Sequence, residues 1–294
     1  MTSKDVRAVA FTLLHTLWLG TSHAADADSL KRDLELSKQV TIYYSEGERI
    51  PTGYTVDRTL ADYAYGLSPA FAPALENLGP RDRWLDIGAG MGKAILDYYA
   101  PGYDVTHAEE RARRGGKAQA IAMSIEDRIT LQWHEMAAKL QPNQMQYFYG
   151  KRLREYSLEQ LGRFQVITDV IGGFSYAADL SLFVEKALGF LELNGSFYTL
   201  LQDVHAGDGT NQPYYKGAPF LTEITDAKGA EVRICGWLKS ITCVEVTCEF
   251  KTSWKPPVEA YGIRKICDEV RVPALLPSQY EAGTPPQRRF QLKN

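Results

Sequence analysis

The sequence lacks an excess of charge of either sign. Its 33 Lys and Arg side chains are nearly balanced by 36 Asp and Glu, for a formal net charge of −3. This balance excludes the broad positive field that attracts nucleic acid. One local basic run, Arg111–Lys117, is more typical of a solvated helix start than of a nucleic-acid patch. We therefore expect a small-molecule substrate and no nucleic-acid partner. The sequence carries no signal for an oligomeric state.

The chain also lacks an apolar run long enough to span a membrane. The nearest candidate, Ala8–Leu19, follows Lys4 and Arg7 and precedes a small-x-small site at Ser22–Ala24. This is the layout of a secretory signal peptide, and the run is too short for a membrane span. A start site upstream of the true one and an amphipathic N-terminal helix are the other interpretations. The fold is therefore expected to begin after residue 26.

Metal-binding cysteine spacing is absent as well. The four cysteines, Cys235, Cys243, Cys248 and Cys267, form no C-x-x-C pair, so a zinc or thioredoxin-like site has little support and no metal site is predicted. The four cysteines are more typical of small side chains buried in the core. If the chain is exported, two disulfides become available instead.

What the chain does have is a glycine-rich turn between a strand and a helix. An apolar strand ending at Asp86-Ile87 runs into glycines at 88, 90 and 92, and a helix-forming run, Lys93–Tyr99, follows. The pattern resembles motif I of class I S-adenosylmethionine-dependent methyltransferases. A dinucleotide fingerprint, G-x-G-x-x-G, would need glycine where Lys93 stands. A turn that uses glycine for geometry alone is the third interpretation.

Strands and helices alternate after this turn. Strands are expected at Arg83–Ile87, Tyr103–Ala108, Arg128–Trp133, Phe164–Val170 and Ser196–Leu201, and helices at Lys93–Tyr99, Lys117–Ser124 and Ala178–Leu193. A loop is expected over residues 171–176. This alternation predicts an α/β, Rossmann-like, doubly wound sheet. The resemblance implies seven mostly parallel strands that end in an antiparallel pair.

The tail changes character. We expect a hairpin in Leu221–Ile234, a short helix at Cys235–Ile241, an antiparallel strand pair at Val244–Lys251 and Tyr261–Cys267, and a loose end over Pro285–Asn294. Two short helices, Val56–Tyr65 and Ser68–Leu78, precede the sheet. The predicted division is a signal peptide or N-terminal helix (1–26), a helical lid (27–79), the S-adenosylmethionine-binding domain (80–275) and a C-terminal tail (276–294).

The resemblance implies a set of cofactor contacts at the strand ends. Asp86, Gly88, Ala89 and Gly90 would form the turn, and Glu109, 23 positions after Asp86, would hold the ribose, with Glu110 as the alternative. His134, Glu135 and Met136 would lie at the adenine. Asp169 would face the methionine ammonium, and the carboxylate would take a donor from Tyr54, Tyr44 or Arg58.

The reacting groups are expected after the fourth and fifth strands. The N-P-P-Y-type tetrapeptide of amino-methylating enzymes is absent, and Phe174 and Tyr176 stand there instead. They could hold the sulfonium by cation–π attraction or pack under the next helix. Asp203 or His205 could serve as a general base, although solvated loop residues are the default. Pro213–Lys216 could line an acceptor pocket.

The resemblance implies an enzyme that transfers a methyl group from S-adenosylmethionine to a small molecule, of the kind found in secondary metabolism. One alternative on this fold is cyclisation of S-adenosylmethionine to azetidine-2-carboxylate and methylthioadenosine. Another is a non-catalytic binding module. S-adenosylmethionine is a cytosolic metabolite, so the cytoplasm is the expected location, with export as the alternative if the N-terminal run is a signal peptide.

Overall fold

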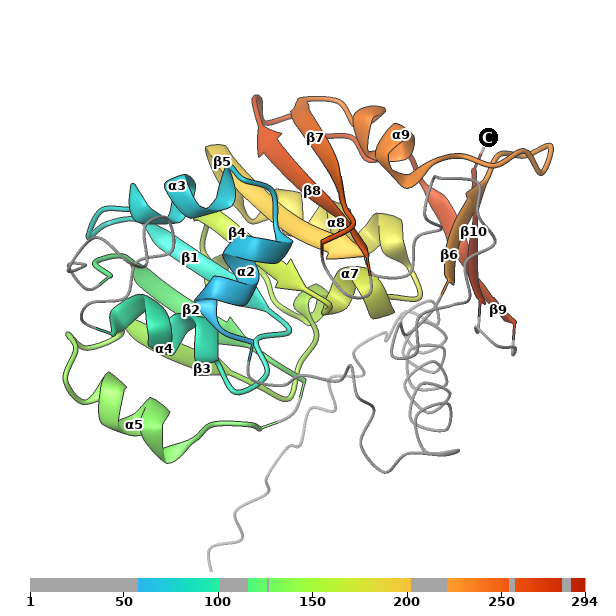
Figure 1. The fold of residues 1–294 in the computed structure, drawn as a ribbon. Coiled ribbons are helices and arrows are strands. Elements are labelled where there is room, and N and C mark those ends of the chain that lie inside the picture. Colours follow the sequence, from blue (N-terminus) through green and yellow to red (C-terminus); the bar gives the residue numbers. More distant parts are fainter. Residues whose placement is uncertain are drawn as a thin grey trace, which may run out of the picture.

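The computed structural model describes residues 58–100, 116–125, 127–201, 221–253, 257–281 and 287–293. These form a seven-stranded sheet and a separate three-stranded sheet (Figure 1). In order across the large sheet, the strands are β3 (Met145–Phe148), β2 (Gln119–Met123), β1 (Arg83–Ile87), β4 (Phe164–Val170), β5 (Leu191–Leu201), β8 (Val258–Lys265) and β7 (Val244–Lys251). β8 is antiparallel to both of its neighbours and the other pairings are parallel. The predicted fold class is confirmed.

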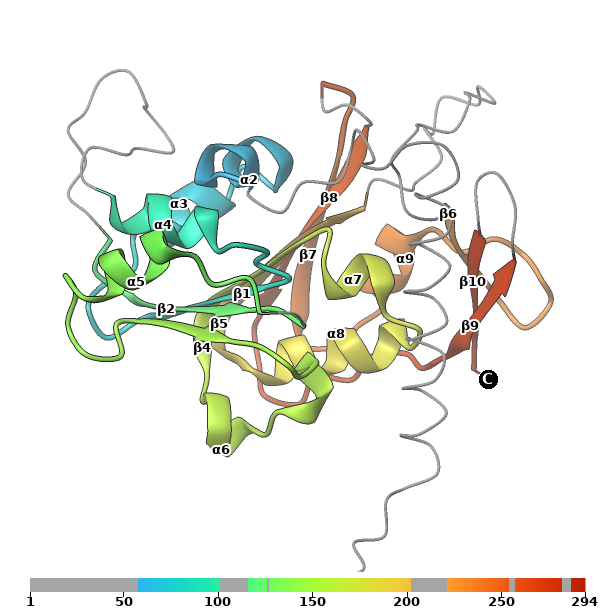
Figure 2. The same cartoon turned by 90° about the horizontal axis from the view of Figure 1, so that it is seen from below.

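Helices cover both faces of the large sheet, as Figure 2 shows. One face carries α2 (Leu60–Gly66), α3 (Phe71–Glu76), α4 (Lys93–Tyr99) and α5 (Leu131–Ala137), and the other carries the 3-10 turn η1 (Leu153–Glu155), α6 (Leu158–Leu161), α7 (Gly173–Tyr176) and α8 (Leu180–Gly189). A parallel sheet covered in this way buries both of its faces. In β1, Trp84 packs into the cluster under α2–α5, whereas Leu85 and Ile87 pack into the cluster under α8.

The second sheet has the order β6 (Leu221–Thr225), β10 (Gln287–Leu292) and β9 (Leu275–Glu281). It lies beside the end of the large sheet that carries α7 (Figure 1). The short helix α9 (Ile234–Lys239) connects β6 to β7 and confirms the predicted helix there. Residues 287–292, expected to be a loose end, pair with both β6 and β9, so that expectation is wrong.

Local signals explain where the helices begin. Thr59 and Asp62 form a capping box at the start of α2, and the Asp179 side chain accepts a hydrogen bond from Leu182 N at the start of α8. α8 ends at Gly189, before the predicted end of that helix. Asn194 and Gly195, which directly follow the predicted helix, lie inside β5. Within the described part of the chain, none of the helices is long and apolar enough to cross a membrane.

The stretch between β1 and β3 differs most from the prediction. The expected strand at 103–108 lies outside the described residues. The expected helix at 117–124 is the strand β2, which pairs in parallel with β1 over five residues. The expected strand at 128–133 is the entry to α5, for which Thr130 is the N-cap. Residues 171–176, expected to be a loop, contain the single turn α7.

Candidate functional site

The glycine-rich turn lies at the carboxyl end of β1, next to the end of β4. Gly88, Gly90 and Gly92 have φ values of 70°, 56° and 72°, which L side chains rarely adopt. A Cβ on Gly88 would lie 2.7 Å from the Cα atom of Gly172. The two strand tips therefore touch backbone to backbone, and only glycine allows this approach.

Hydrogen bonds from the neighbouring strands hold the turn in shape. Ala89 N donates to Met123 O at 3.0 Å, which ties the turn to the tip of β2. The Tyr147 hydroxyl on β3 donates to Gly90 O. A Cβ on Gly92 would overlap the buried indole ring of Trp133 on α5. Three neighbouring elements thus fix the backbone that would face a ligand.

Asp86 lies at the centre of a buried chain of polar side chains. Its carboxylate accepts from the Tyr63 hydroxyl at 3.1 Å and from Thr168 Oγ1 at 2.7 Å, and Thr168 in turn accepts from the Trp84 indole at 2.8 Å. Burial raises the pKa of Asp86 to about 7, although both hydroxyl hydrogen bonds act to lower it. This chain links α2 to β1 and β4, directly beneath the turn.

Asp169, the next-to-last residue of β4, has a similar environment. It is fully buried, and its carboxylate accepts from Gly172 N at 2.7 Å and from Phe174 N at 2.8 Å. Burial raises the pKa of Asp169 to about 7, while these N–H groups and the charge of Arg288 act to lower it. The carboxylate therefore caps α7 and shapes the loop that touches Gly88.

The backbone between Asp169 and Gly172 is strained. Ile171 has a φ of 56°, an outlier for a β-branched residue. Strain of this kind costs on the order of 1–3 kcal/mol and is concentrated at ligand sites and switches. Ile171 lies between the buried Asp169 and Gly172, whose backbone meets Gly88. This position indicates that the junction of β4 and α7 is the functional part of the sheet edge.

Phe174 and Tyr176, the predicted sulfonium contacts, have different surroundings. Phe174 is fully buried, and its ring centroid lies 6.4 Å from that of Phe183 on α8 and 5.7 Å from that of Tyr261 on β8. This is the packing role that the sequence left open. Tyr176 ends α7 and is half-buried. Of the pair, Tyr176 is therefore the better candidate for a ligand contact.

His134, Glu135 and Met136 do not end a strand, so that part of the prediction is wrong. All three lie on α5; His134 and Glu135 are exposed, and Met136 packs against the cluster beneath that helix. The carboxyl tips of β2 and β3 instead carry Ile125 and Tyr149, which are 60% and 50% exposed. Gly150 N donates to Ile125 O at 3.0 Å and joins these tips.

Four predicted site residues lie outside the described residues: Tyr54, Glu109, Asp203 and His205. The same holds for Tyr44, Glu110 and the stretch 213–216. The structure brings Asp86, Gly88, Ala89, Gly90, Asp169 and Tyr176 to one edge of the sheet. Sequence reasoning missed Tyr63, Tyr147 and Thr168, which carry no motif of their own.

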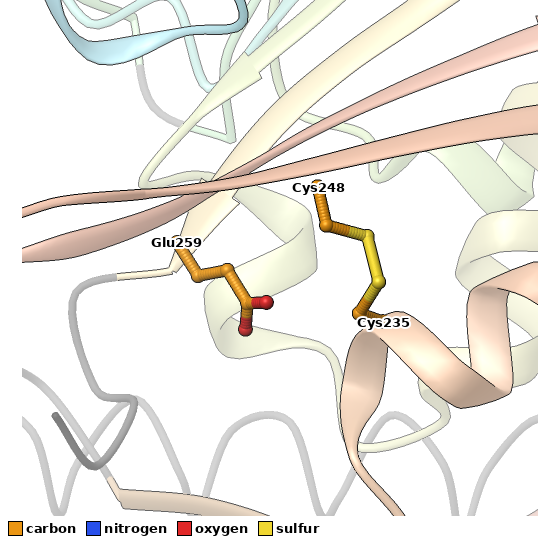
Figure 3. Close-up of side chains that lie close together, drawn as sticks. All are labelled: Cys235, Cys248 and Glu259. Atoms are coloured by element: carbon orange, nitrogen blue, oxygen red, sulfur yellow. A yellow bond between two sulfur atoms is a disulfide. The ribbon is translucent and has the colours of Figure 1, made fainter. Parts of the chain in front are cut away.

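The four cysteines form two disulfides, Cys235–Cys248 and Cys243–Cys267, and all four are at least partly exposed. The expectation of buried core thiols is therefore wrong. Cys235, Cys248 and Glu259 are also the one group of described residues close enough to share a metal ion (Figure 3). Because the two sulfurs are bonded to each other, they are not thiolates and cannot serve as metal ligands in this state.

The strand order of the large sheet and the antiparallel placement of β8 decide the architecture. The chain has the class I methyltransferase fold. Neither the scan against protein-family models nor the search of curated proteins finds a match. The fold assignment therefore rests on the sheet itself.

Several solved structures are weakly similar to this chain. N-methyltransferase NodS from Bradyrhizobium japonicum WM9, in complex with S-adenosyl-L-homocysteine, is 10% identical over 80% of this chain and 98% of that chain, with a TM-score of 0.42. An O-methyltransferase family protein from Burkholderia thailandensis is 12% identical over 83% of this chain and 74% of that one, with a TM-score of 0.42. PKMT2 from Rickettsia typhi, in complex with AdoHcy, is 18% identical over 47% of this chain and 25% of that one, with a TM-score of 0.33. This chain thus spans a quarter of PKMT2, and likenesses this weak assign no activity.

Proposed function

We propose that this protein binds S-adenosylmethionine over the glycine turn and transfers its methyl group to a small-molecule acceptor. The observation that carries the proposal is the contact between Gly88 and Gly172 at the tips of β1 and β4. In an open α/β sheet, ligands bind outside the carboxyl ends of the strands, where the strand order reverses. β1 and β4 are the adjacent central strands at that point.

The residues present fit such a ligand in shape. The turn carries no side chain larger than that of Ala89 between Gly88 and Gly90, so a ligand can approach the backbone closely. Ile125 and Tyr149 offer apolar surface at the tips of β2 and β3, where a base would lie. Because β2 ends at Met123, the ribose-binding acid would be Glu126 or Asp127 rather than Glu109; Glu126 lies outside the described residues.

Bound S-adenosylmethionine would supply an activated methyl group, and the chain's own residues would align the acceptor and exclude water. Tyr176, at the end of α7, would contact the sulfonium face. Asp203 or His205 would act as the base for a hydroxyl or ammonium acceptor. Asp86 would support the glycine turn from beneath and would not contact the ligand, since its oxygens already accept hydrogen bonds from Tyr63 and Thr168.

Calorimetric titration with S-adenosylmethionine and S-adenosylhomocysteine tests this placement. Gly88→Ala should weaken binding at least tenfold, because the added methyl group meets the Gly172 backbone. Gly229→Ala is the matched control, because Gly229 also has a positive φ of 83°, has nothing within 4 Å of the added Cβ and lies in the turn after β6. Equal affinity of the two variants would refute this location of the site.

Mass spectrometry of the products from labelled S-adenosylmethionine separates the reactions. A labelled methyl group on an added acceptor is the expected outcome. Catalytic release of methylthioadenosine without any acceptor would show that the reaction is cyclisation and not methyl transfer. Tight binding with no product under either condition would leave a binding module.

For the compartment, we propose export. Both disulfides engage all four cysteines of the chain, and disulfides persist mainly in oxidising compartments. The signal-peptide layout of residues 1–26 agrees with this. S-adenosylmethionine would then have to be supplied outside the cytosol. Thiol alkylation of the protein in intact cells tests the point. None of the four cysteines should react if both disulfides have formed, whereas reaction of all four would show that the protein is cytoplasmic.

A further inference from the structure

The single helical turn α7 is held at both ends by buried charged side chains. At its start, the Asp169 carboxylate accepts from Gly172 N and Phe174 N. At its end, both terminal nitrogens of Arg288 donate to Phe174 O at 3.1 Å, and Nη1 also donates to Ala177 O at 3.2 Å. Charge-assisted hydrogen bonds of this kind are about twice as strong as neutral ones.

Arg288 comes from a distant part of the sequence, strand β10 of the second sheet. Its side chain is fully buried, with Nη2 at 2.9 Å from Thr222 Oγ1 on β6 and the guanidinium carbon 5.2 Å from the Phe290 ring centroid. The same sheet attaches to the chain after α7, since Ser278 N donates to Ala178 O at 2.8 Å. Figure 1 shows the second sheet on the side of the molecule that carries α7.

A four-residue helix has no stability of its own, because helix nucleation is unfavourable and such a turn closes too few hydrogen bonds. The conformation of α7 must therefore come from its contacts. A buried guanidinium is strongly destabilising unless acceptors surround it, so Arg288 and the carbonyl groups of α7 need each other. The second sheet thus sets the position of the segment that carries Tyr176.

We propose that Arg288 is a positioning residue for the ligand site. It does not touch the ligand. It holds α7 so that Tyr176 and the Gly172 backbone keep their places beside the glycine turn, and the C-terminal sheet is thereby part of the working site. The ligand is that of the proposed function, on which this inference rests.

The test compares Arg288→Met with Arg289→Met. Arg289 is the neighbour on β10; its side chain is partly exposed and pairs with Glu223 at 2.7 Å in the second sheet. Backbone hydrogen exchange of residues 172–177 and the affinity for S-adenosylhomocysteine are measured on each folded protein. Arg288→Met should speed exchange at these amides at least tenfold and weaken binding about tenfold, whereas Arg289→Met should change neither.

Arg288→Lys keeps the charge with fewer donors and should lie between wild type and Arg288→Met in both measurements. Should Arg288→Met fail to fold, Thr222→Val removes one acceptor of Arg288 and should shift both readouts in the same direction by less. Wild-type exchange in these variants would overturn the inference, as would faster exchange with wild-type affinity. If wild type binds neither S-adenosyl compound, the proposed function fails, while exchange still decides whether Arg288 holds α7.

Discussion

Replacing Asp86 by asparagine tests whether the carboxyl group beneath the turn is protonated in the folded protein. Asparagine has almost the same shape, and its amide can still accept from Thr168 and face the Tyr63 hydroxyl. The change therefore removes the ionisable group while keeping the chain of hydrogen bonds that joins α2, β1 and β4.

The size of the effect follows from the pKa. Burial raises the pKa of Asp86 from 3.8 to about 7, and each unit corresponds to about 1.4 kcal/mol. Between these two values the folded protein keeps a proton that the unfolded chain has lost, so the stability of wild type falls as the pH rises through this window. The asparagine amide of the variant has no proton to lose in this range. Relative to wild type, Asp86→Asn should gain about 4 kcal/mol between pH 4 and pH 8.

Urea unfolding at pH 4, 6 and 8 measures this difference, with both disulfides kept intact. Asp169 is present in both proteins, and its charge also raises the pKa of Asp86, so the difference between the two curves reports Asp86 together with its coupling to Asp169. Glu185→Gln, on the exposed side of α8, is the matched control and should follow wild type. Parallel pH profiles for wild type and Asp86→Asn would show that the pKa of Asp86 is the same in the folded and the unfolded chain and would refute the reasoning.

Three further predictions concern stability. Phe174→Ala should cost about 3–5 kcal/mol in a chemical unfolding experiment, because the ring is fully buried; a cost below about 1 kcal/mol would place it outside the core. Lys251→Met should destabilise by about 1–3 kcal/mol, because Lys251 Nζ donates to the carbonyl groups of Tyr65 and Leu67 at the end of α2; an unchanged melting temperature would contradict this. Reducing the disulfides should lower the melting temperature, since each contributes about 3 kcal/mol in the chain-entropy account. An unchanged melting temperature would mean that the cysteines are already reduced in the purified protein.

The elements with strong local signals were predictable. The strand, glycine turn and helix over residues 83–99 follow from residues that admit few other conformations, and β7 has the predicted bounds. The alanines of β2 favour a helix by propensity, so the local pattern predicts a helix where the structure has a strand. Buried between β1 and β3, the same small side chains fit a central strand.

This difference shifts several predicted site residues. A second strand before residue 110 would have its acidic tip at Glu109 and would make Arg128–Trp133 the third strand, whereas β2 is Gln119–Met123 and α5 begins at Leu131. Thr130 was the available signal against this, because its side chain caps α5 by accepting from Trp133 N. With β3 at Met145–Phe148, the strand tip falls at Tyr149, a residue that no motif marks.

By itself, the sequence determined the bend after β1, because three alternating glycines permit backbone conformations that other residues adopt only under strain. It also determined the alternation of strands and helices around that bend. Only the tertiary structure decided that Asp86 and Asp169 are buried, that Arg288 reaches α7, and that the cysteines pair. These features depend on contacts between residues up to 114 positions apart, and local sequence patterns hold no information about such partners.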